Sequence, residues 1–237
     1  MSVFKFKEFN IEHDRTAMKV GTDGVLLGAW VVANSGSINI LDVGTGTGVI
    51  ALMLAQKLNY AKIDAIEIDE GAFQQAIVNV HNSPWFDRIR VFKLSLNEFI
   101  LTHKKDYEMI VCNPPYFLKG YKVDDPQRKF ARDAAYLPHE QLILVARERM
   151  KVDGSLNLIL PIKEGQQFII KAEKAGLYCK RLTFVQTKEY LEPKRILLEM
   201  VKFKSDTNKS NLVIEHAGDN NYTDQYKQLT QDFYLNF

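Results

Sequence analysis

The sequence predicts an α/β fold in which a doubly wound, mostly parallel sheet of seven strands carries an antiparallel C-terminal hairpin. Three observations lead to this prediction. Short β-branched apolar runs alternate with longer runs whose apolar residues are spaced three and four apart. A glycine-rich turn joins the first such pair, and two long strand-like runs follow the series.

The core strands are predicted where short apolar runs are bounded by polar residues or glycine, at residues 38–43, 62–67, 89–93, 107–112 and 154–160. The helical patterns between them span residues 48–58, 71–82 and 138–150. Pro138 suits the first turn of the last of these helices. Repeated alternation of strand and helix makes the strands parallel and covers both faces of the sheet.

The pattern changes beyond residue 160. Two long strand-like runs, 177–185 and 195–204, predict a hairpin across the loop at 190–194. A short strand near 212–214 and a helix near 223–233 are expected after it.

We divide the chain into three segments. Residues 1–35 form an N-terminal cap that includes a helix over 23–32, residues 36–204 form the core, and residues 205–237 form an extension packed on the same domain. The extension carries a net charge of −3, which leaves the rest modestly basic and compatible with a polyanionic partner.

The composition excludes disulfide-rich scaffolds and collagen-like proteins. The 237 residues carry 31 basic and 29 acidic side chains, and 46% are hydrophobic, as in globular proteins. The longest apolar stretch, residues 24–33, is about half of the roughly 20 residues that span a bilayer, and no basic segment leads into an apolar one at the N-terminus. We therefore expect a cytoplasmic protein that contacts no membrane, with a monomer favoured.

Metal and redox chemistry are not expected. Cys112 and Cys179 lack the pairing or spacing of a metal site, and the five histidines show no ligand spacing. Both cysteines are interpreted as reduced packing residues.

The glycine-rich turn is the first candidate site. Gly44, Gly46 and Gly48 follow the first core strand and let the backbone approach a ligand beside the free N–H groups of a helix N-terminus. Plain tight packing of a strand on a helix is the alternative. Val49 stands where the nicotinamide-dinucleotide fingerprint has its third glycine, so the spacing favours another adenosine ligand.

Acidic residues after the first two core strands define that ligand further. Glu67 ends the second core strand, where a carboxylate accepts hydrogen bonds from both ribose hydroxyls. Asp69 is the alternative candidate for this contact. Asp42 ends the first strand, where it would repel a pyrophosphate and attract a cation. These charges point to S-adenosylmethionine, whose sulfonium and ammonium groups are positive.

The tetrapeptide Asn-Pro-Pro-Tyr at residues 113–116 follows the fourth core strand, so it lies at the same sheet edge as the glycine turn. Its prolines have no N–H, which leaves the Asn113 side chain and the Pro114 carbonyl as exposed acceptors for one NH2 group. Tyr116 offers a face on which a flipped base stacks. A proline turn with an Asn cap is the structural alternative. The position of the tetrapeptide, at the same sheet edge as the glycine turn, favours a role in methyl transfer to an aromatic amine over a plain proline turn.

Several further runs carry a resemblance to a known family. They are residues 4–7, Phe9, 13–28, 131–132, 193–195, 222–223 and 232–235. With the two motifs above, they make the chain resemble the bacterial tRNA1(Val) adenine-N6 methyltransferase family, which belongs to the class I S-adenosylmethionine-dependent methyltransferases with a Rossmann-like core. The resemblance covers nearly the whole chain. It implies methylation of N6 of the adenine directly 3′ of the anticodon in a valine tRNA, with the anticodon stem-loop as partner.

The resemblance also implies roles for individual residues. The residues implied to hold the base are Asn113, Pro114 and Tyr116. Those implied to hold the cofactor are Lys19, Thr22, Asp42, Gly44, Thr45, Gly46, Gly48, Glu67 and Ser95. Many relatives have an Asp at the position of Ser95, and Asn97 is the other candidate for its contact with the cofactor adenine.

RNA contacts are expected from basic residues just past the tetrapeptide and beside the predicted hairpin, and the ones we single out are Lys119, Arg132, Lys194 and Arg195. Phosphate contacts of this type supply affinity without reading bases. Asp133 follows Arg132 where the family leads us to expect a His. For single lysines a solvated surface is the simpler interpretation.

Other activities remain open. An RNA guanine-N2 methyltransferase has an active loop that differs mainly in its last aromatic residue. A protein-glutamine N5 methyltransferase uses the same tetrapeptide but resembles chains with a separate helical domain before the sheet, and only 37 residues precede the first core strand here. A DNA adenine methyltransferase would need room for a target-reading domain. A non-catalytic RNA-binding module is the remaining class.

Overall fold

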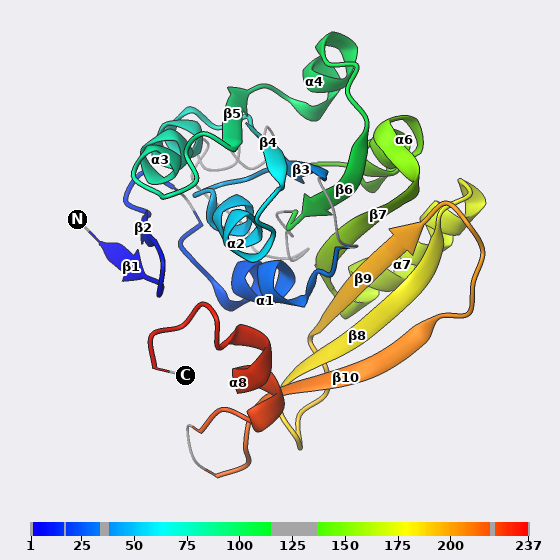
Figure 1. The fold of residues 1–237 in the computed structure, drawn as a ribbon. Helices are drawn as coiled ribbons and strands as arrows, with labels where there is room; N and C mark the ends of the chain where they lie inside the picture. The colour runs from blue at the N-terminus through cyan, green and yellow to red at the C-terminus, as the bar shows by residue number, and fades with distance from the viewer. Residues whose placement is uncertain (1, 17, 34–37, 115–136, 219–220, 237) are drawn as a thin grey trace, which may run out of the picture.

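The computed structural model describes residues 2–16, 18–33, 38–114, 137–218 and 221–236. Within these residues the main sheet has eight strands in the order β10-β8-β9-β7-β6-β3-β4-β5, and a separate two-stranded hairpin is formed by β1 and β2 (Figure 1). The α/β prediction with a mostly parallel sheet is confirmed.

The strands are β1 (Val3–Lys5), β2 (Asn10–Glu12), β3 (Asn39–Val43), β4 (Lys62–Glu67), β5 (Ile89–Lys93), β6 (Tyr107–Cys112), β7 (Met150–Pro161), β8 (Tyr178–Lys188), β9 (Arg195–Val201) and β10 (Asn208–Glu215). The helices are α1 (Thr22–Trp30), α2 (Val49–Lys57), α3 (Glu70–His81), α4 (Leu96–Thr102), α6 (His139–Arg149), α7 (Ile162–Lys174) and α8 (Asp224–Thr230).

The sheet has one strand more than the seven expected. The polar run before residue 212 also takes up extended structure, because β10 pairs in parallel with the whole second half of β8, from Asn208 opposite Arg181 to Glu215 opposite Lys188. The predicted hairpin of β8 and β9 is antiparallel, and β9 also runs antiparallel to β7. Two helices, α4 and α7, and the β1-β2 hairpin were not predicted.

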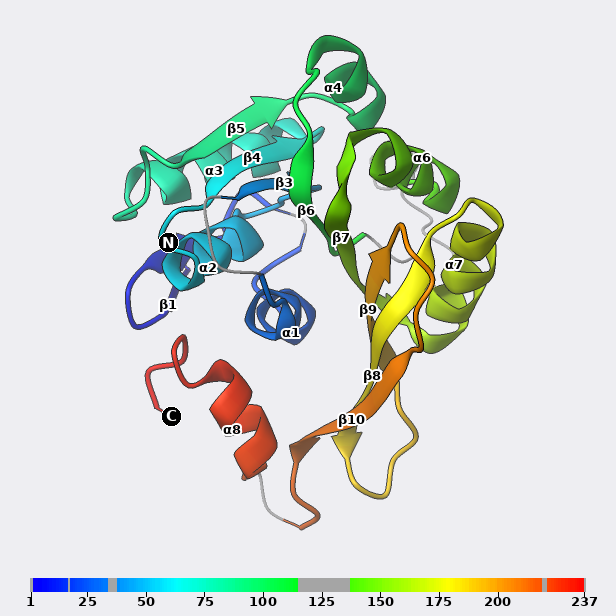
Figure 2. The same cartoon turned by 45° about the vertical axis from the view of Figure 1, so that its right-hand side comes forward.

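Helices cover both faces of the sheet (Figure 2). One core cluster joins α1 and α2 to β3 and β4, and the other joins α4, α6 and α7 to the opposite face. The helix α1 is buried from Gly24 to Trp30, because neighbouring α2 and α8 also cover it. A helix enclosed in this way has no face toward solvent, so its sequence is apolar on all sides and not amphipathic.

The β1-β2 hairpin belongs to the N-terminal cap. Phe6 stacks on Phe9 with ring centroids 4.6 Å apart, and Phe6 also stacks on Tyr234 beyond α8. The cap and the C-terminal extension are thus held together by aromatic rings, and the chain between β2 and α1 runs over α3 toward the carboxyl edge of the parallel strands.

Candidate active site at the carboxyl edge of the sheet

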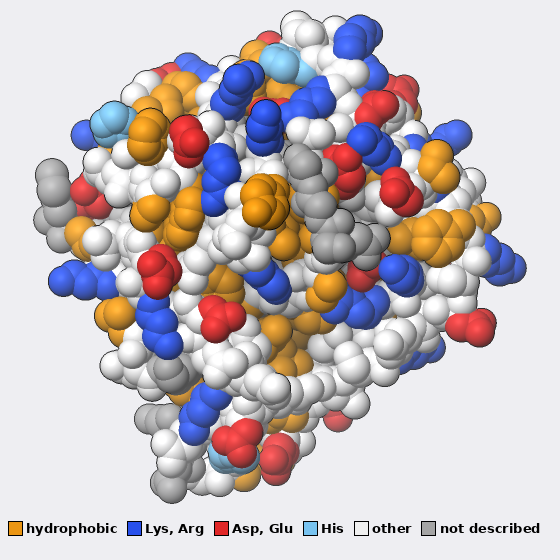
Figure 3. Space-filling model, viewed as in Figure 1, with side chains coloured by type: hydrophobic (Ala, Val, Ile, Leu, Met, Phe, Trp, Pro, Cys, Tyr) orange, Lys and Arg blue, Asp and Glu red, His pale blue; other side chains and the backbone are white. Residues whose placement is uncertain are grey.

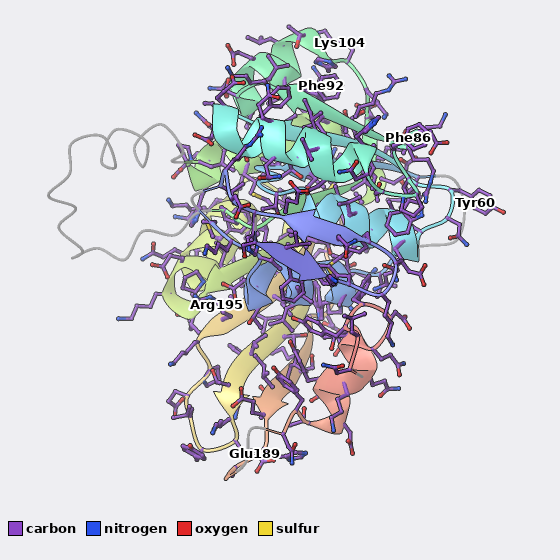
Figure 4. All side chains as sticks on the ribbon, turned by 90° about the vertical axis from the view of Figure 1, so that its left-hand side faces the viewer. Tyr60, Phe86, Phe92, Lys104, Glu189 and Arg195 are labelled. Atoms are coloured by element: carbon purple, nitrogen blue, oxygen red, sulfur yellow. The ribbon has the colours of Figure 1, made fainter. Side chains whose placement is uncertain are left out.

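The two motifs meet because β3 and β6 are paired neighbours. Asp42 is opposite Val111, and Val43 is opposite Cys112, so the glycine turn and Asn113 leave adjacent strands at the same level. Figure 4 shows Arg195 on one side of the molecule and Tyr60, in the loop before β4, on the opposite side. The candidate site lies at the Arg195 end, where the parallel strands finish.

The glycine turn has the backbone that its sequence requires. Gly44, Gly46 and Gly48 have φ values of 69°, 58° and 83°, a region that favours glycine. The amides of Gly44 and Thr45 both donate to the Ile66 carbonyl oxygen, at 2.9 and 3.0 Å, which holds the turn against β4. A Cβ at Gly44 or Gly46 would meet nothing within 4 Å, so this part of the turn faces open space that a ligand can fill.

Asp42 lies below this turn and is fully buried. Its Oδ2 accepts a hydrogen bond from Thr45 Oγ1 at 2.6 Å, whereas Oδ1 is buried without a partner of ordinary hydrogen-bond geometry in the described structure. Burial raises the pKa of Asp42 to about 7. The Thr45 hydroxyl and, more weakly, the Ala51 amide oppose this rise, and the nearby Glu67 carboxylate adds to it. An unpartnered buried carboxylate oxygen fits a cationic ligand.

Glu67 closes the site from β4. Its Oε2 accepts from the Gly46 amide at 2.9 Å, and Oε1 accepts from the amides of Ile68 and Asp69. Asp69 has a different task, because its Oδ1 accepts from the Ala72 amide and caps α3. Of the two candidate ribose ligands, Glu67 is therefore the one whose carboxylate faces the glycine turn.

Asn113 and Pro114 follow β6 directly; Asn113 is half-buried and Pro114 is buried. A Cβ built on Gly24 would lie 4.0 Å from Asn113 Nδ2 and 3.3 Å from Val49 Cγ1. The first turn of α1 therefore passes against both the Asn113 side chain and the start of α2. Tyr116 lies outside the described residues.

The expected contacts from the cap are Lys19 and Thr22. Both are exposed, and Thr22 begins α1, two residues before Gly24. The cap thus brings these two residues to the edge where the glycine turn and Asn113 lie, while their contact with the cofactor stays a prediction.

Ser95 has a structural role in the described chain. Its hydroxyl accepts from the Glu98 amide, and the Glu98 carboxylate accepts from the Ser95 amide, so the two residues form a capping box for α4. Ser95 still lies near the site, since the amide of Leu94 donates to the Glu67 carbonyl oxygen.

The four expected RNA contacts divide into two groups. Lys119 and Arg132 lie outside the described residues. Lys194 is exposed beside β9, and Arg195 Nε donates to Asp23 Oδ2 at 2.8 Å. On the face in Figure 3, Lys and Arg are interspersed with Asp and Glu, so basic side chains do not gather into one patch among the described residues visible there.

Two residues of the site were not predicted. Gln75 and Asn79 are each 2% exposed on α3, and their side chains hold the backbone of the cap. The signal in the sequence is a pair of carboxamides four residues apart on a helix face that is otherwise apolar.

The described residues contain no group of three His, Cys, Asp or Glu side chains that would hold a metal ion, and none of their helices has the length and hydropathy to cross a bilayer. Cys112 and Cys179 are both free and buried, and burial raises the pKa of both thiols. This agrees with their interpretation as packing residues.

Comparison with known proteins shows which family the chain is similar to. Residues 21–173 match the model of the methyltransferase small domain family. The chain is 45% identical over 233 residues to a tRNA1(Val) (adenine(37)-N6)-methyltransferase of Flavobacterium psychrophilum, covering 98% of this chain and 99% of that one. A protein of the same name from Trichodesmium erythraeum is 43% identical, with 99% and 98% covered.

Solved structures show the same fold. A predicted O-methyltransferase from Agrobacterium tumefaciens superposes with a TM-score of 0.67 at 20% identity, covering 89% of this chain and 96% of that one. The Pyrococcus horikoshii protein TYW2, solved in complex with MeSAdo, gives a TM-score of 0.59 at 15% identity, with 85% and 72% covered. At these identities the likeness concerns the fold.

Proposed function

We propose the reaction of this chain from its family, because the chain belongs to the tRNA1(Val) (adenine(37)-N6)-methyltransferases. The reaction is transfer of a methyl group from S-adenosylmethionine to N6 of an adenine in tRNA. The adenine is the one directly 3′ of the anticodon of a valine tRNA, and the anticodon stem-loop is the part that the enzyme binds. A tRNA substrate implies a cytoplasmic enzyme, and we propose that it acts as a monomer.

One observation carries this proposal: the glycine turn and Asn113 follow paired residues of adjacent strands, Val43 and Cys112. A ligand on the turn and a base held at Asn113 would therefore share one space. Such proximity converts a bimolecular transfer into an effectively unimolecular step.

The residues on the cofactor side fit S-adenosylmethionine. The open face of Gly44 and Gly46 leaves room for the nucleoside, and Glu67 supplies a carboxylate for the ribose hydroxyls. Asp42 places a buried carboxylate with one unpartnered oxygen below the turn, which suits a cationic group. The cofactor supplies an electrophilic methyl group on a sulfonium ion, and the chain supplies position and opposite charge.

The residues on the base side fit an exocyclic amine. The Asn113 side-chain oxygen and the Pro114 carbonyl oxygen accept its two hydrogens, and Pro114 has no competing N–H. Hydrogen bonds from both N–H groups to these acceptors free the nitrogen lone pair for attack on the methyl carbon, and S-adenosylhomocysteine would be the neutral leaving group. The methylated nitrogen would be positively charged and acidic, so it would lose one proton to water without a strong base. Tyr116 is the proposed stacking partner of the flipped base. Lys119, Arg132, Lys194 and Arg195 are the proposed phosphate contacts.

The test uses purified protein, labelled S-adenosylmethionine and transcribed valine tRNA. We expect label in N6-methyladenosine after nucleoside analysis, and its loss when the adenine at position 37 is replaced by guanine. Label in N2-methylguanosine would indicate the guanine-specific alternative. Label in protein glutamine, or in no product at all, would contradict the proposal.

A further inference from the structure

The side chain of Asn79 connects the cap to the glycine turn. Its Oδ1 accepts from the Glu12 amide at 2.9 Å, and its Nδ2 donates to the Glu12 carbonyl oxygen at 2.9 Å and to the Thr47 carbonyl oxygen at 2.8 Å. Glu12 ends β2 in the cap, and Thr47 belongs to the glycine turn. Asn79 is 2% exposed, so these hydrogen bonds do not compete with solvent.

The geometry is specific for a carboxamide. Binding both backbone groups of Glu12 fixes that residue in two directions, and the second Nδ2 hydrogen is used on Thr47. A carboxylate at this position would have no donor for either carbonyl oxygen, and an aliphatic side chain would leave all three backbone groups unpaired.

The same face of α3 holds the next residues of the cap. Gln75 Oε1 accepts from the Arg15 amide at 3.2 Å, one turn before Asn79. One turn earlier still, a Cβ on Gly71 would lie only 2.5 Å from the Arg15 carbonyl oxygen, so glycine is required for the cap to come this close. Figure 1 shows β2 beside α3.

Hydrogen bonds around the buried His13 hold the described residues between Arg15 and α1. His13 is 7% exposed, its Nδ1 accepts from the Val20 amide, and Thr16 Oγ1 donates to the carbonyl oxygens of His13 and Met18. By holding Glu12 and Arg15, α3 therefore sets the positions of Lys19 and Thr22.

We infer that Asn79 is a positioning residue that couples the cap to the glycine turn, so that cofactor binding and ordering of residues 12–16 and 18–22 occur together. This inference rests on the proposed function, because it deepens the account of the same cofactor site. It makes cofactor affinity depend on a side chain whose hydrogen bonds are all to backbone atoms of Glu12 and Thr47.

The variant Asn79→Leu keeps the branched shape and removes the three hydrogen bonds. We expect the affinity for S-adenosylhomocysteine, measured by calorimetry, to fall by about tenfold or more, while tRNA affinity changes by less than about threefold. Trypsin should cut faster after Arg15 and Lys19, and saturating S-adenosylhomocysteine should restore protection.

The matched control is Ser83→Ala. Ser83 is also buried beside the C-terminal end of α3. Its hydroxyl donates to the Val80 carbonyl oxygen and accepts from the Trp85 amide, so its hydrogen bonds reach neither the cap nor the glycine turn. Equal loss of cofactor affinity in both variants, at equal loss of melting temperature, would overturn the inference and leave Asn79 a structural residue.

A second measurement needs no variant. In the wild-type protein, S-adenosylhomocysteine should slow hydrogen exchange of the Glu12 and Arg15 amides, which donate to Asn79 and Gln75. Unchanged exchange at both amides, with slower exchange in the glycine turn, would contradict the coupling. Failure of the wild type to bind S-adenosylhomocysteine would instead contradict the proposed cofactor.

Discussion

Arg195 and Asp23 form an ion pair, Nε to Oδ2 at 2.8 Å, between the first residue of β9 and the first turn of α1. Their side chains are 32% and 24% exposed, so the pair is shielded only in part from solvent. It joins segments 172 residues apart at the edge where Asn113 lies. The residue proposed as a phosphate contact is thus also attached to the helix that borders Asn113.

Replacing each partner separates these two roles of Arg195. We expect Asp23→Asn and Arg195→Gln each to lower the free energy of unfolding by about 0.5–1 kcal/mol. Only Arg195→Gln should weaken tRNA binding and reduce its salt dependence, because only this variant removes a positive charge available to phosphate. Filter binding over a series of salt concentrations measures this, and equal weakening in both variants would mean that Arg195 acts solely through Asp23.

Substitutions at Glu67 and Asp69 should affect two different properties, cofactor binding and stability. Glu67→Gln should weaken S-adenosylhomocysteine binding by about tenfold or more, since a carboxamide replaces one of the acceptors offered to the ribose. Asp69→Ala should lower the free energy of unfolding by about 1 kcal/mol, because α3 loses its N-cap. Calorimetry and urea denaturation of both variants test this, and the assignment is wrong if the two effects are exchanged.

Asp42 should make cofactor binding depend on pH. Its pKa is raised by burial from 3.8 to about 7, so at about pH 6 the Asp42 carboxyl group is protonated in most of the ligand-free protein. A cation next to the carboxylate lowers that pKa, so binding should release a proton and weaken as pH falls below about 7. Calorimetry in two buffers of different ionisation enthalpy measures the released proton.

The Asp42→Asn variant is the control, and its binding should release no proton at this site. The same pKa predicts that the ligand-free protein loses stability as pH rises from about 4 to about 7, because the unfolded chain gives up this proton first. Asp42→Asn should flatten that part of the profile. Proton release that persists in Asp42→Asn would contradict the prediction.

Asn113→Ala should abolish methyl transfer and leave S-adenosylhomocysteine affinity within about threefold of the wild type, because the side chain is proposed to hold the base alone. Single-turnover assays with saturating tRNA provide the measurement. Retained turnover would remove the proposed amine clamp.

Gly24→Ala should lower activity without lowering stability. Alanine favours a helix by about 1 kcal/mol over glycine, yet its Cβ would lie 3.3 Å from Val49 and 4.0 Å from the Asn113 amide. We expect kcat to fall by about tenfold without loss of melting temperature. The equivalent change at Gly176, whose φ is 80°, should lower stability and leave kcat unchanged.

Sequence reasoning located the parallel core well for a physical reason. The strands β4, β5 and β6 begin and end as predicted, because short apolar runs between polar residues are distinctive when a sheet is covered on both faces. The helix α7 was missed although it is amphipathic, since its buried stripe consists of Gly165, Phe168 and Ala172, and two of these carry little hydrophobic signal.

The candidate site was predictable where chemistry is local in sequence. The glycine turn and Asn113 could be placed together because parallel strands end at one edge. Ser95 shows the opposite case, because a serine three residues before a glutamate also predicts a capping box, and the structure has this cap at Ser95 and Glu98. For Asn79 the sequence carries a signal of burial but not the partners, which are backbone atoms of residues distant in sequence.

The contact between the two ends of the chain has a consequence for biosynthesis. The Lys7 amide donates to the Phe233 carbonyl oxygen, and the ring of Phe6 stacks on Tyr234, although these partners are separated by more than nine-tenths of the chain. During translation the β1-β2 hairpin therefore leaves the ribosome long before Phe233 and Tyr234. These two contacts of the hairpin form only after residues 233–234 have been synthesised, and a chaperone can cover the exposed edge of Phe6 until then.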